Sequence, residues 1–235
     1  MIDLHTHILP CMDDGSASVK ESLQMLATEY DQGIHRVALT PHFYAEDETP
    51  EMFLQRREKS YQELIKAMQE EKGVFPEIHL GSEVRYYEGI SQSKELIDLK
   101  IQGSNLLLLE MPFAQWNDRM LREVYSFQQR LGVQVVLAHI ERYLKYQNQF
   151  LFWKKIEVAE LLVQSNANFF IQKNSRRKAL NLFKKGRIHL LGSDCHNCSV
   201  RSPNLGEAVV VLEESLGASF QQWIVEVESK TIYQI

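Results

Sequence analysis

Apolar runs that end in polar residues recur along the chain, and a helical pattern closed by a glycine precedes several of them. The clearest examples are DQGIHRVALTPH (31–42), RLGVQVVLAH (130–139) and KKGRIHLLGSDCH (184–196). Gly33, Gly132 and Gly186 are predicted to end helices, because glycine readily adopts the left-handed conformation found at helix C-termini. Helix, glycine, apolar strand and polar residue therefore form a recurring unit, which is typical of βα alternation.

The same pattern predicts the remaining elements. Further strands are expected at MIDLHTH (1–7), EIHLGSE (77–83), SNLLLLE (104–110) and ANFFIQKN (167–174). Helices are expected from the capping box Ser18–Glu21 to about Tyr30, from Thr49-Pro50 to about Glu71, at about 118–131, at about 151–164, and from Ser202-Pro203 to near Gly217. The core-facing side of the first helix is predicted to carry Val19, Leu23, Leu26 and Tyr30.

About seven strands, each followed by a helix, suit a single α/β domain that spans residues 1–235. Repeated βα units form either a closed barrel or an open, doubly wound sheet. An open sheet usually binds its ligands at one crevice, whereas a barrel gathers residues from many strand ends at one mouth. The polar residues at the strand ends therefore decide between the two folds.

Composition narrows the class of protein. The net charge is −5 and the basic residues do not run together, so no nucleic-acid partner is expected. No apolar run approaches the roughly 18 residues of a membrane span, so no membrane insertion is expected. The absence of an N-terminal signal pattern and the presence of only three cysteines favour a cytoplasmic protein. The sequence does not indicate the oligomeric state.

Residues able to bind a metal ion follow six of the seven predicted strands. They are His5 and His7, His42, Glu83, Glu110, His139, and Asp194 with His196; Asp14 lies in the loop after the first strand. Residues two apart on a strand face the same way, so His5 and His7 form a natural chelating pair. These side chains would meet at the C-terminal mouth of a barrel, where barrel active sites lie. His35, His79 and His189 lie earlier in their strands and are expected to be ordinary hydrogen-bonded residues.

Nine ligands exceed the needs of one ion, so two or three divalent ions bridged by a shared carboxylate are predicted. Imidazole and carboxylate ligands without thiolate suit Mn, Fe or Zn. Such clusters favour hydrolysis, because the ions lower the pKa of a bridging water. Arg142 and Arg201 follow ligand-bearing strand ends, and two guanidinium groups beside a cationic cluster favour a phosphate substrate.

The stretch GSDCHNCSVRS (192–202) allows a different interpretation. Cys195 to Ser202 fits the C-x5-R-S phosphate loop of thiol-dependent phosphatases, and Cys195 with Cys198 forms a C-x-x-C pair. A thiol mechanism would leave all nine strand-end ligands without a role. It would also place Asp194 beside the thiol, which raises a thiol pKa. The metal interpretation is therefore preferred, and Cys195 is kept as an alternative nucleophile.

The motifs DLHTHILP, TPH, GSE, AHIER and GSDCHN resemble those of the PHP (polymerase and histidinol phosphatase) superfamily. Within it, DLHTHILPCMDDGS together with VVLAHIERY is similar to the bacterial capsular and exopolysaccharide protein-tyrosine phosphatases of the CpsB/CapC type. The resemblance spans residues 2 to about 206. It implies a distorted, TIM-like (β/α)7 barrel with a manganese-dependent site of three ions.

The resemblance also implies roles for individual residues. One ion would take His5, His7, Glu83 and Asp194; a second would share Glu83 and take Glu110 and His139; a third would take Asp14, His42 and His196. Arg142 and Arg201 would hold the phosphate while a metal-bridging hydroxide attacks phosphorus. The implied substrate is phosphotyrosine on a bacterial tyrosine autokinase that controls polysaccharide export. A small phosphomonoester such as histidinol phosphate, and a module that binds phosphotyrosine without cleaving it, remain alternatives.

Overall fold

The computed structural model describes residues 1–227, apart from the side chain of Gln149. The strands are β1 Ile2–Thr6, β2 Arg36–Leu39, β3 His42–Phe43, β4 Glu77–Leu80, β5 Glu83–Arg85, β6 Leu106–Glu110, β7 Gln134–Leu137, β8 Leu162–Asn166 and β9 Leu190–Gly192. The helices are α1 Val19–Asp31, α2 Pro50–Glu70, α3 Asp118–Leu131, α4 Gln149–Val158, α5 Ala167–Ile171, α6 Lys173–Lys184, α7 Leu205–Leu216 and α8 Ala218–Val227. Three 3-10 turns are η1 Ile90–Gln92, η2 Glu95–Leu99 and η3 Ile140–Arg142. Within residues 1–227, none of the helices is both long and apolar enough to cross a bilayer.

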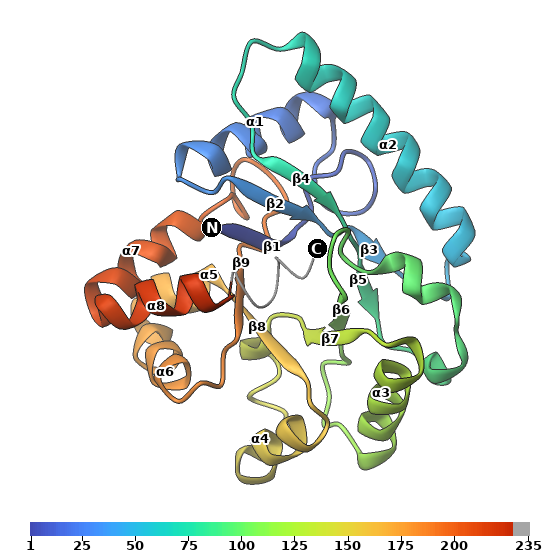
Figure 1. Cartoon of the computed structure of the whole chain (residues 1–235), viewed down its shortest axis with the longest axis vertical. Helices are drawn as coiled ribbons and strands as arrows, with labels where there is room; N and C mark the ends of the chain where they lie inside the picture. The colour runs from blue at the N-terminus through green and yellow to red at the C-terminus, as the bar shows by residue number, and fades with distance from the viewer. Residues whose placement is uncertain (228–235) are drawn as a thin grey trace.

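The strands are all parallel to their neighbours and curl into a barrel with helices outside (Figure 1). The hydrogen-bonded orders are β1-β2-β4 and β3-β5-β6-β7-β8-β9. The line of β2 is continued by β3, and that of β4 by β5, after short breaks in each strand. The backbone beyond β9 closes the ring, because His7 N donates to Cys195 O at 2.9 Å and Asp194 N donates to His5 O at 2.8 Å. The predicted distorted (β/α)7 barrel is confirmed, and the open-sheet alternative is wrong.

Both faces of the strands are buried, which explains their continuous apolar runs. In β6, Leu106 and Leu108 belong to the cluster inside the barrel, whereas Leu107 and Leu109 pack in the larger cluster beneath the helices. Successive strand side chains point to opposite faces, so a parallel strand enclosed on both sides has no polar face. The barrel interior is therefore packed, and polar side chains collect at its ends.

Several predicted element boundaries are confirmed. Thr49 caps α2 by accepting from Met52 N, with Pro50 in the first turn. The predicted helix 118–131 coincides with α3. Gly33, Gly132 and Gly186 have positive φ angles of 80°, 65° and 62° just beyond their helices. These capping signals are local in sequence, which is why they could be located without the fold.

Three predicted elements are wrong in part. The expected strand 77–83 is two strands, β4 and β5. The expected helix 151–164 ends at Val158, and residues 162–166 form β8; the expected strand 167–174 begins instead with helix α5. Glu160 adopts a left-handed conformation (φ 54°) after α4, in a place where α1, α3 and α6 are followed by a glycine. Because no glycine marks the end of α4, the sequence pattern predicts too long a helix and places the following strand too late in the chain.

The predicted apolar face of α1 is wrong in part. The buried residues are Ser22, Met25, Leu26 and Glu29, so Leu26 is the one predicted residue that is fully buried, while Leu23 is partly buried and packs against the core. Ser22 is accommodated because its hydroxyl donates to Ile8 O at 2.6 Å. Glu29 lies beneath the β1–β9 seam, with Oε1 3.8 Å from Cys195 Sγ. Polar residues thus occupy this face because distant segments supply their partners.

Glu29 is expected to make folding depend on pH. Burial and the neighbouring Asp3 raise the pKa of Glu29 well above its usual range, and burial also raises the pKa of Asp3. The folded protein therefore retains a proton that the unfolded chain loses at neutral pH, so stability falls as pH rises above the ordinary carboxyl pKa. Glu29→Gln should raise Tm by at least about 2 °C at pH 8, and the gain should shrink toward pH 5.

Differential scanning calorimetry between pH 5 and pH 8.5 would measure this effect. The control is Glu63→Gln on the exposed face of α2, which should leave the Tm profile unchanged. If the Tm of Glu29→Gln at pH 8 fell below that of the wild type, Glu29 would not be retaining a proton in the folded protein.

Candidate metal centre

The carboxyl ends of the strands bring the nine predicted ligands to one mouth of the barrel. His5 lies in β1 and His7 directly follows it, β3 begins with His42, β5 begins with Glu83, and β6 ends with Glu110; His139 follows β7, Asp194 and His196 follow β9, and Asp14 lies in the β1–α1 loop. The side chains of His42 and Asp14 are 12% and 66% exposed, and the other seven are almost entirely buried. The predicted clustering is therefore observed, while the role of these residues as metal ligands stays a prediction.

Glu83 stands at the centre of the cluster. Its Oε2 lies 3.1 Å from His5 Nε2, 3.3 Å from His7 Nε2 and 3.0 Å from His42 Nδ1. Its Oε1 lies 2.9 Å from His139 Nε2. One carboxylate thus contacts imidazoles from four strand positions, which is the geometry expected of a shared, bridging ligand.

Two further groups flank Glu83. On one side, Glu110 Oε1 lies 3.3 Å from His139 Nε2. On the other, Asp14 Oδ1 lies 3.7 Å from His42 Nε2 and 3.4 Å from His196 Nε2. Possible ligand atoms lie within 4.8 Å of one another in three groups: His7, Asp14, His42 and His196; His5, His7 and Glu83; Glu83, Glu110 and His139. His7 thus lies close to two of the three sets.

Asp194 joins the centre to its two arginines. Its Oδ1 lies 3.6 Å from His5 Nε2 and 3.5 Å from His7 Nε2. Arg201 Nη2 donates to the same Oδ1 at 2.7 Å, and Arg142 Nη2 pairs with Oδ2. The arginine side chains are about one third exposed, at 37% for Arg142 and 35% for Arg201. Both guanidinium groups therefore lie at the mouth beside the cluster, as predicted.

Unsatisfied polar atoms in the cluster fit a bound cation. Glu83 Oε2 and His196 Nε2 are buried, and although ionisable groups lie close to both atoms, neither makes a hydrogen bond of good geometry with a described residue. Leaving a buried polar atom without a partner costs about 1–3 kcal/mol, more for a charged group. Divalent cations bind imidazole nitrogens and carboxylate oxygens, so the donor set fits the predicted metal ions.

The electrostatics of the cluster also favour positive charge. Burial lowers the pKa of His7, but Asp13 and Glu83 outweigh it and raise the pKa to about 10. Burial likewise opposes protonation of His139, yet Glu110 and Glu83 raise its pKa to about 9. Burial and His7 together lower the pKa of His196 to about 4. Carboxylates thus attract cations to the centre, while His196 is neutral and able to offer a lone pair.

Asp13 supports the centre and was missed by the sequence prediction, which selected its neighbour Asp14. Asp13 Oδ2 lies 2.7 Å from His7 Nδ1 and accepts from His42 N at 2.8 Å. This contact orients the His7 ring so that Nε2 faces Glu83, as carboxylate partners commonly orient metal-binding histidines. Gly15 permits the loop to approach, because a Cβ there would lie 2.2 Å from His7 O. The sequence Asp13-Asp14-Gly15 indicated a functional loop, but it did not show which aspartate would be the proposed ligand and which would orient His7.

The end of β8 supplies two more missed residues. Gln164 Oε1 accepts from His139 N at 2.7 Å and lies 3.3 Å from His5 Nδ1. Asn166 Nδ2 donates to Asp194 Oδ2 at 2.8 Å, and Gln164 Nε2 donates to Asn166 Oδ1 at 3.0 Å. These amides hold ligands from three strands in place. Gln164 and Asn166 stand two apart after the apolar run LLV. With a strand predicted at 162–166, this spacing would have indicated that both face the mouth.

Cys195 is on the wrong face of the strand for a nucleophile. It is fully buried and its thiol points to Glu29. Burial, Glu29 and Asp3 raise the pKa of Cys195 well above the ordinary thiol range, whereas a nucleophilic cysteine needs a lowered pKa and access. Cys198 is exposed and contacts Glu21 instead. The geometry therefore does not support the alternative mechanism through Cys195.

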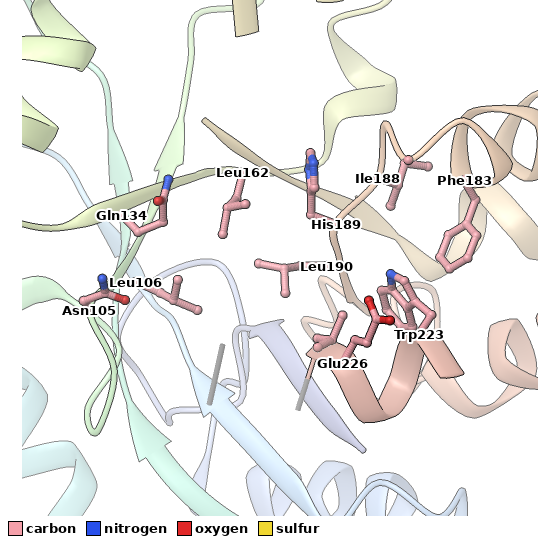
Figure 2. Close-up of a pocket in the computed structure, with 12 residues that line it drawn as sticks. Asn105, Leu106, Gln134, Leu162, Phe183, Ile188, His189, Leu190, Trp223 and Glu226 are labelled. Atoms are coloured by element: carbon pink, nitrogen blue, oxygen red, sulfur yellow. The ribbon is translucent and has the colours of Figure 1, made fainter. Parts of the chain in front are cut away.

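The opposite end of the barrel has a different character. A cavity of about 430 Å³ there is lined by residues from the starts of β6 to β9 and from α8, including Leu106, Leu162 and Trp223 (Figure 2). Among the described residues that line it, the ionisable side chains are His189 and Glu226. His189 Nδ1 accepts from Val163 N at 3.1 Å, the ordinary role expected from its position in the strand. The side chains able to bind a metal ion therefore gather at the mouth of the barrel and not around this cavity.

Comparisons with known proteins agree with this geometry. The family model described as "Capsular polysaccharide synthesis, CpsB/CapC" matches residues 1–234. Tyrosine-protein phosphatase YwqE of Bacillus subtilis is 28% identical over 236 residues, covering 96% of this chain and 89% of the relative. Tyrosine-protein phosphatase CpsB of Streptococcus agalactiae serotype III is 27% identical over 228 residues, covering 92% and 91%.

A solved structure shares the whole fold. It comes from the crystal structures of YwqE from Bacillus subtilis and CpsB from Streptococcus pneumoniae, described as unique metal-dependent tyrosine phosphatases. The match has a TM-score of 0.80 at 26% identity and covers 97% of this chain and 93% of the other. The likeness therefore extends over nearly the whole of both chains.

Proposed function

Because this chain belongs to the CpsB/CapC family of capsular polysaccharide synthesis, we propose that it is a metal-dependent protein-tyrosine phosphatase. The observation that carries the proposal is the cluster around Glu83, where imidazoles from four strand positions meet one carboxylate beside two arginines. Relatives that span nearly the same length are named tyrosine-protein phosphatases. The proposed substrate is a phosphotyrosine protein of the cytoplasm, a bacterial tyrosine autokinase in the first instance.

The proposed cofactor is two or three divalent ions, Mn2+ in preference to Fe, Co or Zn. His5, His7, Glu83 and Asp194 would hold one ion, Glu83, Glu110 and His139 a second, and Asp14, His42 and His196 a third. Bound ions would lower the pKa of an attacking water and offset the charge of the phosphate. Asp13 orients the His7 ring through Nδ1, and Gln164 Oε1 contacts His5 Nδ1 and the backbone N–H of His139.

The arginines would position the phosphate. Asp194 pairs with one amino group of Arg142 and one of Arg201, and the other amino group of Arg201 lies 3.8 Å from Asp14 Oδ2. The phosphate would bind the N–H donors that these carboxylates leave unused at the mouth. Two guanidinium groups can grip several oxygens of a phosphate dianion at once, in fixed geometry. Asp194 thus faces the imidazoles and also fixes the positions of the Arg142 and Arg201 side chains relative to each other.

An exposed ring at the edge of the centre favours an aryl phosphate. Phe113 is 46% exposed, and its ring stacks on His139 with centroids 5.8 Å apart and on Tyr143 with centroids 5.6 Å apart. Tyr44 stacks similarly on His42 at 5.1 Å. Aromatic rings beside the phosphate site suit a phenyl leaving group better than the aliphatic alcohols of phosphoserine or histidinol phosphate.

A comparison of substrates tests the proposal. With Mn2+ present, kcat/KM for a phosphotyrosine peptide should exceed that for a matched phosphoserine peptide or histidinol phosphate by at least about tenfold. Phe113→Ala should lower the phosphotyrosine value by about two- to tenfold, because an aromatic pair contributes roughly 0.5–1.5 kcal/mol. The phosphoserine value should not change.

EDTA provides the control for this comparison, since it should stop phosphate release until Mn2+ is restored. Faster turnover of histidinol phosphate or phosphoserine would refute the choice of substrate. Tight binding of the phosphotyrosine peptide without any phosphate release would indicate a binding module instead of an enzyme.

A further inference from the structure

An apolar groove lies between α3 and α4, two helices that follow one another on the outside of the barrel (Figure 1). Its volume is about 550 Å³, and its apolar lining is formed by Leu121, Tyr125, Leu151, Val158 and Ala159. Four of the eleven large hydrophobic side chains that are exposed in the described chain lie on these two helices: Tyr125, Phe150, Leu151 and Val158. Phe150 and Val158 are 88% and 71% exposed. Such a concentration of exposed apolar side chains typically marks a binding surface.

The rim of the groove is basic. It carries Arg122, Lys154 and Lys155 against a single acidic residue, Asp118. Lys155 pairs with Asp118 at 2.6 Å, whereas Arg122 and Lys154 form no ion pair with a described residue. The whole chain has a net charge of −5, so this surface opposes the overall charge. A partner that complements it needs acidic side chains around an apolar stripe.

A chain of ring contacts ties the groove to the proposed metal centre. The Phe152 ring of α4 lies 5.4 Å from Trp116, Trp116 lies 4.8 Å from Tyr143, and Tyr143 lies 5.4 Å from His139. Both helices begin just after loops at the mouth of the barrel, so Asp118 and Leu151 form the end of the groove nearest the centre. α4 has ten residues and is about 15 Å long, so a short peptide segment would fill the groove.

A second copy of the chain is a poorer occupant. In a two-fold interface the same patch meets itself, so the basic rim of one copy would face the basic rim of the other, with Asp118 as the acidic residue that lines the groove. Like charges placed opposite each other disfavour such an interface. A segment that combines acidic and apolar side chains can pair with the basic rim and also pack against the apolar lining of the groove.

We propose that the α3–α4 groove docks an acidic segment with spaced apolar side chains that belongs to the phosphotyrosine protein substrate. This inference rests on the proposed function, because it assumes that the substrate is a protein. Docking beside the centre would raise the local concentration of the phosphotyrosine without adding a contact to the phosphate.

Two synthetic phosphotyrosine peptides of equal length test the proposal with the Mn2+-loaded enzyme. One carries a flank of Asp and Glu with Leu at helical spacing, and the other carries a flank of Ser, Gly and Asn. The wild type should hydrolyse the acidic-apolar peptide with a KM about tenfold lower than the neutral one. Val158→Asp should remove the preference for the acidic-apolar peptide, and Arg122→Glu with Lys154→Glu should raise the KM of that peptide at least to the KM of the neutral one. Turnover of 4-nitrophenyl phosphate should stay within about twofold in every variant, because the groove lining contains neither a proposed metal ligand nor Arg142 or Arg201.

Matched variants sharpen the comparison. Val210 on α7 is also exposed, at 53%, so Val210→Asp controls for adding a surface charge and should keep the preference. The Arg122→Glu, Lys154→Glu variant should instead prefer a flank in which Lys and Arg replace the acidic residues. Equal KM values in the wild type, or a preference that survives both groove variants, would overturn the proposal. It would also be overturned if light scattering showed a wild-type dimer that Val158→Asp dissociates.

Failure of the proposed function would look different. In that case neither peptide nor 4-nitrophenyl phosphate would be hydrolysed with any divalent metal. Fluorescence anisotropy of the labelled, unphosphorylated acidic-apolar flank would still test the groove. Binding to the wild type that is lost in Val158→Asp supports docking, and no binding to the wild type overturns it.

Discussion

Glu83→Gln should lower kcat/KM by on the order of 10³-fold or more and should reduce the metal content together with the rate. The reason is the position of this carboxylate, within 3.3 Å of His5, His7, His42 and His139. Burial raises the pKa of Glu83, but His5, His139 and His7 outweigh it and lower the pKa well below its usual range, so the side chain is anionic. Glutamine keeps the shape but removes the charge that would bridge the ions.

Steady-state kinetics and elemental analysis of the purified variant would measure this effect. Glu77→Gln is the matched control, because Glu77 opens the neighbouring β4 and its side chain is 65% exposed. It should retain both metal and activity, and circular dichroism should show both variants folded. A Glu83→Gln enzyme with full metal content and near wild-type rate would exclude a central role for the carboxylate.

Arg142→Ala should leave the metal content unchanged and lower kcat/KM by about 10²- to 10³-fold. Arg142 sits at the mouth on η3 and pairs with Asp194, while Arg201 binds the other oxygen of that carboxylate. Removing Arg142 therefore leaves Asp194 with a cationic partner, so the centre stays assembled. Inhibition by inorganic phosphate should weaken in parallel, because the lost donors would contact the phosphate itself.

The conservative variant separates the two roles of Arg142. Arg142→Lys keeps the charge but loses the planar fork, so it should recover only part of the rate. Arg119→Ala serves as the control, since Arg119 on α3 is 66% exposed and pairs with Glu88 and Glu123. Loss of metal from Arg142→Ala would show that the arginine mainly supports Asp194.

The nine strand-end residues could be found from the sequence because they depend on local rules. Alternation places His5 and His7 on one side of a strand, and glycine marks where the preceding helices end. The same rules failed where α4 ends, because Glu160 takes the left-handed conformation without a glycine. Because this signal is absent, the predicted strand starts five residues after the observed β8. Gln164 and Asn166 were therefore not recognised as strand-end residues.

The other omissions have a common physical cause. Glu29, Ser22 and Asp13 are polar side chains whose burial is compensated by residues far away in the sequence. Glu29 lies against Cys195, Ser22 donates to Ile8 O, and Asp13 accepts from His42 N. A periodicity test treats such residues as solvent-facing, because it cannot see which partners the fold will bring. Sequence reasoning thus located the ligands but not the groups that orient them.

The seam between β1 and β9 sets the order in which the protein can become active. Asp3 accepts from Ser193 N, a residue 190 positions later in the chain, and the proposed ligands come from both sides of this seam. A chain emerging from the ribosome holds His5 and His7 from the start but meets Asp194 and His196 only after β9 is made. Contacts between such distant segments form late, because a long loop must close first. We therefore expect a nascent chain to lack phosphatase activity until the barrel closes, and bound metal to slow its reopening.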